Sequence, residues 1–234
     1  MERWLFLDSG SAPGAENMAL DELLLERTGR PGGAPVLRLY SFDPPAITIG
    51  CHQNPDLILD VERVRADGLD CVRRITGGRA LLHEGELTYC VVAPALSALL
   101  DCGPGEAYLR ISAAISTALR SLGIDAGVFR GREVAGPKGT AAPCLSSVTR
   151  WELAVGGKKI AGSAQRSSAA AFLQHGSILV RSGSERIAIA FAEMFDIEWE
   201  PLDLSETDEA EIAARSLAKR REALGSIAGE VCPP

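Results

Sequence analysis

Segments with strand and helix periodicity alternate along this chain of 234 residues, and the alternation limits it to a mixed α/β fold. Residues 15–27 and 105–122 carry apolar side chains at helical spacing, and Gly123 follows the second segment as a helix-ending residue. Short apolar runs separated by Gly and Pro lie between these helices and predict strands. We expect one large α/β domain, because a chain of this length with 46% hydrophobic residues buries a full core.

The same two patterns predict further elements. Strands are expected at 4–7, 36–40, 46–49, 71–75, 87–92 and 173–180, and helices at 61–66, 185–195 and 206–224. A hairpin is expected between 151–155 and 158–164, because alternating residues flank a Gly156-Gly157 turn. Asp43-Pro44-Pro45 predicts a turn, and the Gly- and Pro-rich residues 131–142 predict a loop.

Charge and hydropathy exclude several classes of protein. The formal net charge of -7 argues against a nucleic-acid binder, whose surface is normally basic. Residues 1–7 include Glu2 and Arg3 within an apolar run too short for a secretory signal, and no apolar stretch approaches membrane-spanning length. We expect a cytoplasmic protein with no nucleic-acid or membrane partner.

Six cysteines are scattered through the chain without a CxxC pair, so neither a disulfide framework nor a metal site is expected. They are Cys51, Cys71, Cys90, Cys102, Cys144 and Cys232. Five are expected to be small buried hydrophobic residues. Cys144 differs, because it follows Pro143 at the end of the predicted loop, where a thiol is reachable.

The segment 73–83, RRITGGRALLH, combines a flexible backbone with three fixed positive charges. Gly77 and Gly78 lack a Cβ, so a ligand could lie against bare amides there, while Arg73, Arg74 and Arg79 supply charge. The alternative is a hairpin turn with solvated arginines.

A reactive thiol needs a nearby cation or base that favours the thiolate. Lys158 and Lys159 follow the hairpin turn, and strand alternation sends them to opposite faces, so only one of them can point into a pocket. The pattern does not choose between them. The alternative is a buried cysteine and two solvated lysines.

Six segments stand in the order found in the biotin/lipoate protein ligase family, and the resemblance covers roughly residues 1–195. They are NMALDE (17–22), LRLY (37–40), PPAITIG (44–50), residues 73–83, GKKIAGSAQ (157–165) and QHGSIL (174–179). Within this family the chain most resembles the single-domain, cysteine-dependent octanoyltransferases. Arg79 replaces the third glycine common in ATP-dependent lipoate ligases, and Pro143-Cys144 stands where those transferases carry their nucleophile.

The resemblance implies a fold and a set of site residues. The fold is of the class II biotin/lipoate ligase type, with mixed, largely antiparallel sheets flanked by helices, in one catalytic domain whose residues 196–234 form a helical extension. Cys144 is the implied nucleophile and Lys159 the lysine that assists it. The implied substrate-binding residues are Arg73, Thr76, Gly77, Gly78, Arg79, His83, Gly162, Ser163, Ala164 and His175. Met18, Tyr40, Leu81 and Leu82 are candidates for an apolar slot.

The implied reaction moves octanoyl from octanoyl-acyl carrier protein to a lysine of a lipoyl-accepting protein, such as the glycine cleavage H protein or the lipoyl domains of 2-oxoacid dehydrogenases. No ATP, metal or other cofactor is expected, because a thioester is already activated. Three alternatives stay open: amidotransfer between lipoyl-bearing proteins, ATP-dependent lipoate ligation in which Cys144 is incidental, and non-enzymatic binding of a lipoyl domain. His83 and His175 are expected in the pocket wall, and Arg79 either contacts the carrier or pairs with Glu84 or Glu86. Two residues depart from the family's usual pattern. Leu145 follows Cys144 where an aromatic residue is common, and Cys90 follows Tyr89 where a serine is common.

Overall fold

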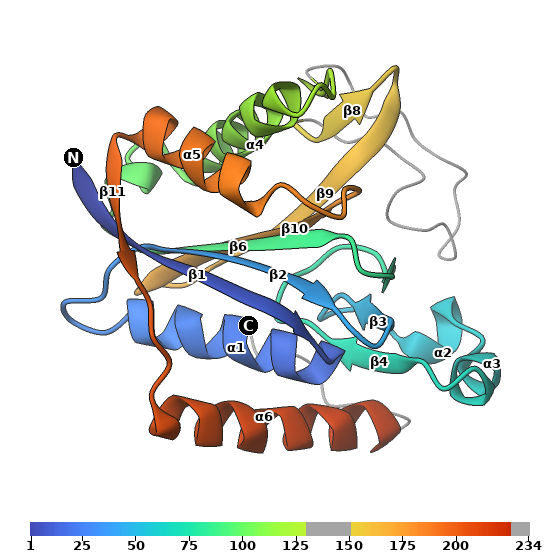
Figure 1. Cartoon of the computed structure of the whole chain (residues 1–234). Coiled ribbons are helices and arrows are strands. Elements are labelled where there is room, and N and C mark those ends of the chain that lie inside the picture. The colour runs from blue at the N-terminus through green and yellow to red at the C-terminus, as the bar shows by residue number, and fades with distance from the viewer. Residues whose placement is uncertain (130–150, 226–234) are drawn as a thin grey trace.

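An eight-stranded sheet forms the centre of the computed structural model, which describes residues 1–129 and 151–225 (Figure 1). Its strand order is β11 (Ile197–Pro201), β1 (Glu2–Ala12), β2 (Val36–Phe42), β6 (Leu87–Pro94), β10 (Ala171–Ile178), β9 (Lys158–Ser167), β8 (Leu153–Val155) and β7 (Gly127–Val128). Strand β1 runs parallel to both β2 and β11, and the other neighbours pair antiparallel.

A second, three-stranded sheet lies beside one end of the large sheet. It consists of β4 (Asp70–Arg73), β3 (Ala46–Ile49) and β5 (Leu81–His83), with β3 in the middle. Two short helices, α2 (Pro55–Ile58) and α3 (Val61–Ala66), lie on the outside of this small sheet (Figure 1). The turn at Asp43-Pro44-Pro45 therefore carries the chain from the large sheet to the small one.

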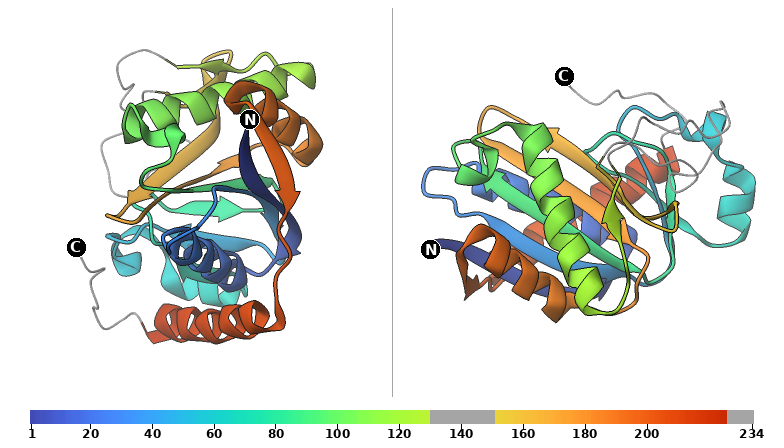
Figure 2. Two further views of the ribbon diagram at one scale, coloured as in Figure 1. Left: turned by 90° about the vertical axis from the view of Figure 1, so that its left-hand side faces the viewer. Right: turned by 90° about the horizontal axis from the view of Figure 1, so that it is seen from above.

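Helices cover both faces of the large sheet (Figure 2). On one face lie α4 (Pro104–Ser121), preceded by a 3-10 turn at Ala98–Leu100, and α5 (Ser184–Phe195). On the other face lies α1 (Gly14–Thr28), and α6 (Glu206–Gly225) packs outside α1. Arg215 of α6 makes two hydrogen bonds to the Glu26 carboxylate of α1, at 2.8 and 2.6 Å. Among the described residues, no helix combines the length and apolar character needed to cross a membrane.

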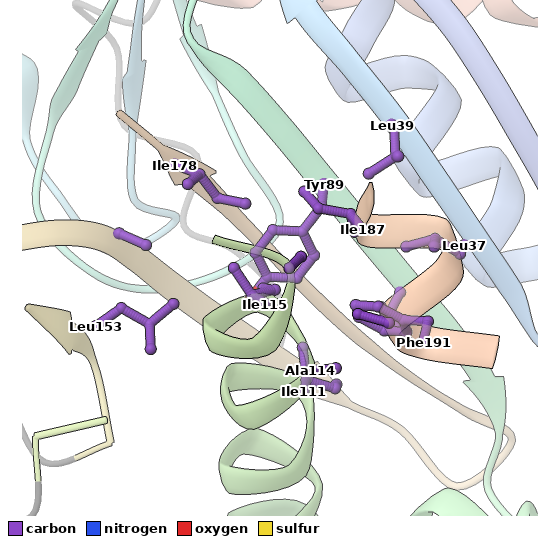
Figure 3. Close-up of a cluster of buried hydrophobic side chains, with 14 of the residues drawn as sticks. Leu37, Leu39, Tyr89, Ile111, Ala114, Ile115, Leu153, Ile178, Ile187 and Phe191 are labelled. Atoms are coloured by element: carbon purple, nitrogen blue, oxygen red, sulfur yellow. The ribbon is translucent and has the colours of Figure 1, made fainter. Parts of the chain in front are cut away.

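Strand β6 shows why the sheet needs cover on both sides. Its first seven residues, LTYCVVA, are all buried. Because neighbouring side chains on a strand point to opposite faces, Tyr89 and Val91 enter the core under α4 and α5, whereas Cys90 and Val92 enter the core under α1. Figure 3 shows the first of these cores, where Tyr89 lies among side chains from β2, α4 and α5.

The structure confirms the predicted strands and helices that fall within its described residues, although their ends differ, most of all for β1, which was predicted at 4–7 and extends over Glu2–Ala12. Three short strands, β5, β7 and β11, and the single-turn helix α2 were not predicted. Strand β11 lies in the segment expected to be only helical, and it forms the sheet edge beside β1. The predicted loop 131–142 and Cys144 lie outside the described residues.

The expectation of buried cysteines holds for Cys51 and Cys90 but is wrong for Cys102, which is exposed just before α4. Cys71 is half-buried, and burial raises the pKa of its thiol to about 11. Cys102 belongs to the short turn between the 3-10 segment and α4, and connecting segments of this kind run over the protein surface.

Replacing Phe191 by alanine tests the core beneath α5. Phe191 is fully buried, so Phe191→Ala should lower the free energy of unfolding by about 3–5 kcal/mol, measured by urea denaturation. Ile189 on the same helix is 40% exposed, and Ile189→Ala should cost about 1 kcal/mol or less. Equal losses in the two variants would contradict the described orientation of α5.

Candidate active site

A pocket opens where the glycine-rich segment after β4 meets β9 and β10. Seven of the residues expected to bind substrate line it: Gly78, Arg79, His83, Gly162, Ser163, Ala164 and His175. They come from three separate parts of the chain, so the two sheets together form this pocket. Three other expected residues, Arg73, Thr76 and Gly77, do not line it.

One wall of the pocket is apolar, as an acyl chain requires. Met18 of α1, Tyr40 and Phe42 of β2, and Leu81 of β5 line this wall. Leu82, also expected there, is 45% exposed and lies outside the pocket lining. Alternation along β5 explains the difference, because Leu81 and His83 point to one side of the strand and Leu82 to the other.

The glycine-rich segment lies against the small sheet at very close range. A Cβ placed on Gly50 would stand 2.3 Å from the carbonyl oxygen of Gly78. Gly78 itself has a φ of +96°, a backbone conformation that favours glycine. Both residues therefore have a steric reason to be glycine at this edge of the pocket.

Arg74 holds the same segment in place. Its guanidinium is buried and donates hydrogen bonds to the carbonyl oxygens of Gly77 at 2.7 Å and Arg79 at 2.9 Å. It also donates to the backbone and side-chain oxygens of Thr48, both at 3.2 Å. Arg74 thus ties the segment to β3.

Arg73, expected to bind substrate, points away from the pocket. Its guanidinium donates to the carbonyl oxygens of Gly50, Cys51 and Gln53 at 2.8–3.2 Å. Because neighbouring residues of an extended chain point to opposite sides, Arg73 and Arg74 are expected to differ in direction. The sequence does not show which of the two sides meets the pocket.

His175 of β10 is held by a buried network. Its Nδ1 lies 2.8 Å from the Asp21 carboxylate, and its Nε2 lies 2.6 Å from the Thr76 hydroxyl. Because a carboxylate only accepts, we assign a proton to Nδ1, which donates to Asp21, while Nε2 meets the Thr76 hydroxyl. Thr76 therefore supports the pocket from behind rather than lining it.

Asp21 is the centre of this network. The Arg38 guanidinium lies 2.6 Å from Asp21 Oδ1, the two side chains are each 1% exposed, and the Tyr40 hydroxyl donates to Oδ2 at 2.9 Å. Burial by itself raises the pKa of Asp21, but the charge of Arg38 and the hydrogen bond from His175 outweigh it and lower the pKa below its usual value. The carboxylate therefore stays charged and anchors the imidazole.

His83 forms a second fixed part of the wall. Its ring stacks on Phe42 with centroids 3.9 Å apart, and its two nitrogens lie 2.6 Å from Glu86 and 2.9 Å from the Thr48 hydroxyl. Burial lowers the pKa of His83, although Glu86 acts in the opposite direction. These contacts agree with a role in the pocket wall, and they occupy the Glu86 carboxylate that was a candidate partner for Arg79.

Ser163 is positioned by residues of the central strands. Its hydroxyl lies 2.6 Å from the Tyr89 hydroxyl, which accepts a hydrogen bond from the Gln174 amide at 2.7 Å. Burial raises the pKa of Tyr89 to about 12, so the phenol stays protonated and can donate to Ser163.

Lys159 is the inward-facing lysine of the β8–β9 hairpin, as expected. It is buried, whereas Lys158 is exposed. The Lys159 ammonium donates to the Glu152 carboxylate at 2.6 Å, and the two side chains are 2% and 5% exposed. Glu152 was not singled out in the sequence, where it reads as an outward residue of an alternating strand. Cys144 lies outside the described residues.

In the described part of the chain, no group of three or more His, Cys, Asp or Glu side chains is placed so that it could hold a metal ion. The pocket itself presents apolar side chains and residues of glycine-rich segments, and Lys159 is not among the residues that line it.

Residues 13–196 match the family of the lipoyl protein ligase A/B catalytic domain, and the chain belongs to this family. It is similar to octanoyltransferase LipM of Moorella thermoacetica, with 39% identity over 80% of this chain and 69% of that protein. It is also similar to octanoyltransferase LipM of Symbiobacterium thermophilum, with 43% identity over 76% of this chain and 65% of that protein. The matched part thus spans about two thirds of the length of these relatives.

Two solved structures share the fold. A bi-partite lipoate protein ligase from Thermoplasma acidophilum has a TM-score of 0.76 and 20% identity, over 99% of this chain and 100% of that chain. A lipoate-protein ligase A bound with ATP has a TM-score of 0.73 and 24% identity, over 96% of this chain and 99% of that chain. The expected fold class and family resemblance are confirmed.

Removing Arg38 tests the buried network. Arg38→Met leaves the Asp21 carboxylate buried without its cation, so we expect a loss of about 3–5 kcal/mol in the free energy of unfolding, measured by urea denaturation. Arg3→Met is the control, because Arg3 pairs with Glu200 on the surface, with side chains 73% and 45% exposed, and should cost about 1 kcal/mol or less. A loss at Arg38 no larger than that at Arg3 would show that Asp21 does not depend on this pair.

Proposed function

We propose that this chain transfers an octanoyl group from octanoyl-acyl carrier protein to a lysine of a lipoyl-accepting protein, through a thioester on Cys144. The observation that carries the proposal is the similarity to octanoyltransferases at about 40% identity over most of the chain. The apolar pocket and the buried lysine of the β8–β9 hairpin support it from the structure.

In the first step, Cys144 Sγ attacks the carbonyl carbon of the octanoyl thioester. A carbon–sulfur bond to Cys144 forms, the bond to the carrier's phosphopantetheine sulfur breaks, and the leaving thiolate takes up the proton that Cys144 lost. The Lys159 ammonium stabilises the attacking thiolate and the tetrahedral oxyanion. Backbone amides near Gly78 or Gly162 can add hydrogen bonds to that oxyanion.

In the second step, the neutral amine of the acceptor lysine attacks octanoyl-Cys144. A carbon–nitrogen bond forms, the bond to Cys144 Sγ breaks, and the proton lost by nitrogen returns to the thiolate. The products are an amide and the free enzyme thiol. A thioester donor is already activated, so this sequence consumes no ATP.

The apolar wall provides for chain-length selection. Seven carbons beyond the carbonyl, at about 0.8 kcal/mol for each buried methylene, give about 6 kcal/mol of binding free energy. Met18, Tyr40, Phe42 and Leu81 are the side chains against which these carbons would lie.

The donor and acceptor proteins are the finer part of the proposal. Octanoyl-acyl carrier protein as donor, and the glycine cleavage H protein or lipoyl domains of 2-oxoacid dehydrogenases as acceptors, follow from the family resemblance, as does a cytoplasmic location. Amidotransfer from one lipoyl-bearing protein to another would use the same Cys144 and Lys159. Comparing octanoyl-acyl carrier protein with octanoylated H protein as donors separates the two reactions.

Mass spectrometry of the protein mixed with octanoyl-acyl carrier protein tests the nucleophile. We expect octanoyl on the peptide containing Cys144, without added ATP, and we expect Cys144→Ser to lose acceptor modification while the fold is retained. Cys102→Ser is the matched control, because Cys102 is exposed and should be dispensable. Octanoyl found on Cys102, or ATP-dependent use of lipoate by Cys144→Ser, would overturn the acyl-cysteine assignment.

Paired lysine variants test the role of Lys159. Lys159→Ala should slow both acylation of Cys144 and release to the acceptor by roughly 100-fold or more, because a group that stabilises charge in both steps is lost. Lys158→Ala should change either rate little, since Lys158 is exposed. Single-turnover kinetics of each step provides the measurement. A larger loss in Lys158→Ala would show that Lys158, and not Lys159, assists the reaction.

A further inference from the structure

We propose that Glu152 is a positioning residue that keeps the Lys159 side chain protonated and fixes the place of its ammonium for acyl transfer. This inference rests on the function proposed above and extends it to a residue that does not touch the substrate. The observation that carries it is the 2.6 Å contact between Lys159 Nζ and Glu152 Oε1, made by two side chains that are almost completely buried.

Burial is what makes the contact important. A lysine taken out of water disfavours its charged form unless an opposite charge lies close to it. The Lys159 side chain is 2% exposed, so solvent contributes little to its charge, and the Glu152 carboxylate supplies a nearby negative charge. An exposed pair such as Arg3 and Glu200 has no such effect, because water solvates both groups.

The backbone beside Glu152 has an unusual conformation that fits this role. Trp151 has a φ of +74°, which is rare for a bulky residue, and its ring packs near Tyr108 with centroids 6.2 Å apart. The Trp151 amide donates to the Phe129 carbonyl at 2.7 Å, and the Phe129 amide donates to the Glu152 carbonyl at 2.8 Å. The chain therefore enters β8 through a strained, hydrogen-bonded turn immediately before the residue that meets Lys159.

The register of the hairpin contributes to the same placement. Lys159 pairs with Ala154, and the register shifts between Leu153 and Ala154. Tyr89 of β6 is another titratable group that the Glu152 charge affects, but burial raises its pKa to about 12, so it stays protonated over the working range. Lys158, the neighbouring cation, is exposed to water.

The proposal gives Glu152 a definite effect on the pH dependence of the reaction. If Lys159 acts as a cation, removing the Glu152 charge lets Lys159 lose its proton at lower pH, and the rate then declines from a lower pH on the alkaline side. If Lys159 instead acts as a neutral base, the same change increases the rate near neutral pH. The sign of the change therefore separates the two roles.

The experiment compares wild type, Glu152→Gln, Glu152→Asp and Glu200→Gln. The rate of octanoyl transfer to Cys144 is measured against pH with octanoyl-acyl carrier protein, by mass spectrometry of the Cys144 peptide. For Glu152→Gln we expect the alkaline limb to move down by at least about one pH unit, and the rate at pH 8 to fall about 10-fold or more. Glu152→Asp keeps the charge and should retain the wild-type limb, and Glu200→Gln should leave the whole profile unchanged. An unmoved limb, or a faster Glu152→Gln enzyme at neutral pH, overturns the proposal.

A direct titration covers the case in which Glu152→Gln does not fold. The chain has four lysines, Lys138, Lys158, Lys159 and Lys219, so carbon-13 labelling at lysine Cε gives a simple NMR spectrum, with Lys159→Arg to assign its signal. In wild type we expect Lys159 to give the signal of an ammonium at pH 8, and a neutral amine there would overturn the proposal. The titration involves no substrate, so it tests the Glu152–Lys159 pair even if wild-type protein accepts no octanoyl group, a result that would reject the proposed function alone.

Discussion

The buried ion pair between Arg38 and Asp21 is the interaction on which the rest of the site depends. Both side chains are 1% exposed, and the pair joins β2 to α1 at the centre of the molecule. Asn17, one helical turn before Asp21, accepts hydrogen bonds from Arg38 through both its backbone and side-chain oxygens. Asp21 then holds His175, so the position of α1 is coupled to that of β10.

Hydrogen bonds hold the glycine-rich segment from two sides. Thr76 meets His175 from the side of the large sheet, while Arg74 binds the carbonyl oxygens of Gly77 and Arg79 from the side of the small sheet. A flexible glycine-rich backbone is thus held at a fixed distance from the apolar wall. Preorganisation of this kind allows backbone amides to serve an oxyanion without rearranging during the reaction.

Particular residues show which parts of the site could be predicted from the sequence alone. Strand alternation predicted that only one of Lys158 and Lys159 faces inward, and the family resemblance indicated Lys159, which the structure finds buried. The same reasoning about Arg73 and Arg74 did not separate their roles, because it lacked the position of the small sheet relative to the pocket. The sequence did not indicate a role for Glu152, because a carboxylate that alternates with apolar strand residues is predicted to face solvent.

The sequence by itself determined the elements, the α/β class and the family, because periodicity and motif order are local properties of the chain. It also indicated most of the pocket residues, which lie in five of the six family motifs. Only the tertiary structure decided which side chains meet across those motifs: Asp21 with His175, 154 positions apart, and Lys159 with Glu152. The first contact depends on the packing of α1 against the large sheet, and the second on the register of the β8–β9 hairpin, which local patterns do not encode. The tertiary structure also decided that Cys102 is exposed and that β11 pairs with β1 at the edge of the large sheet.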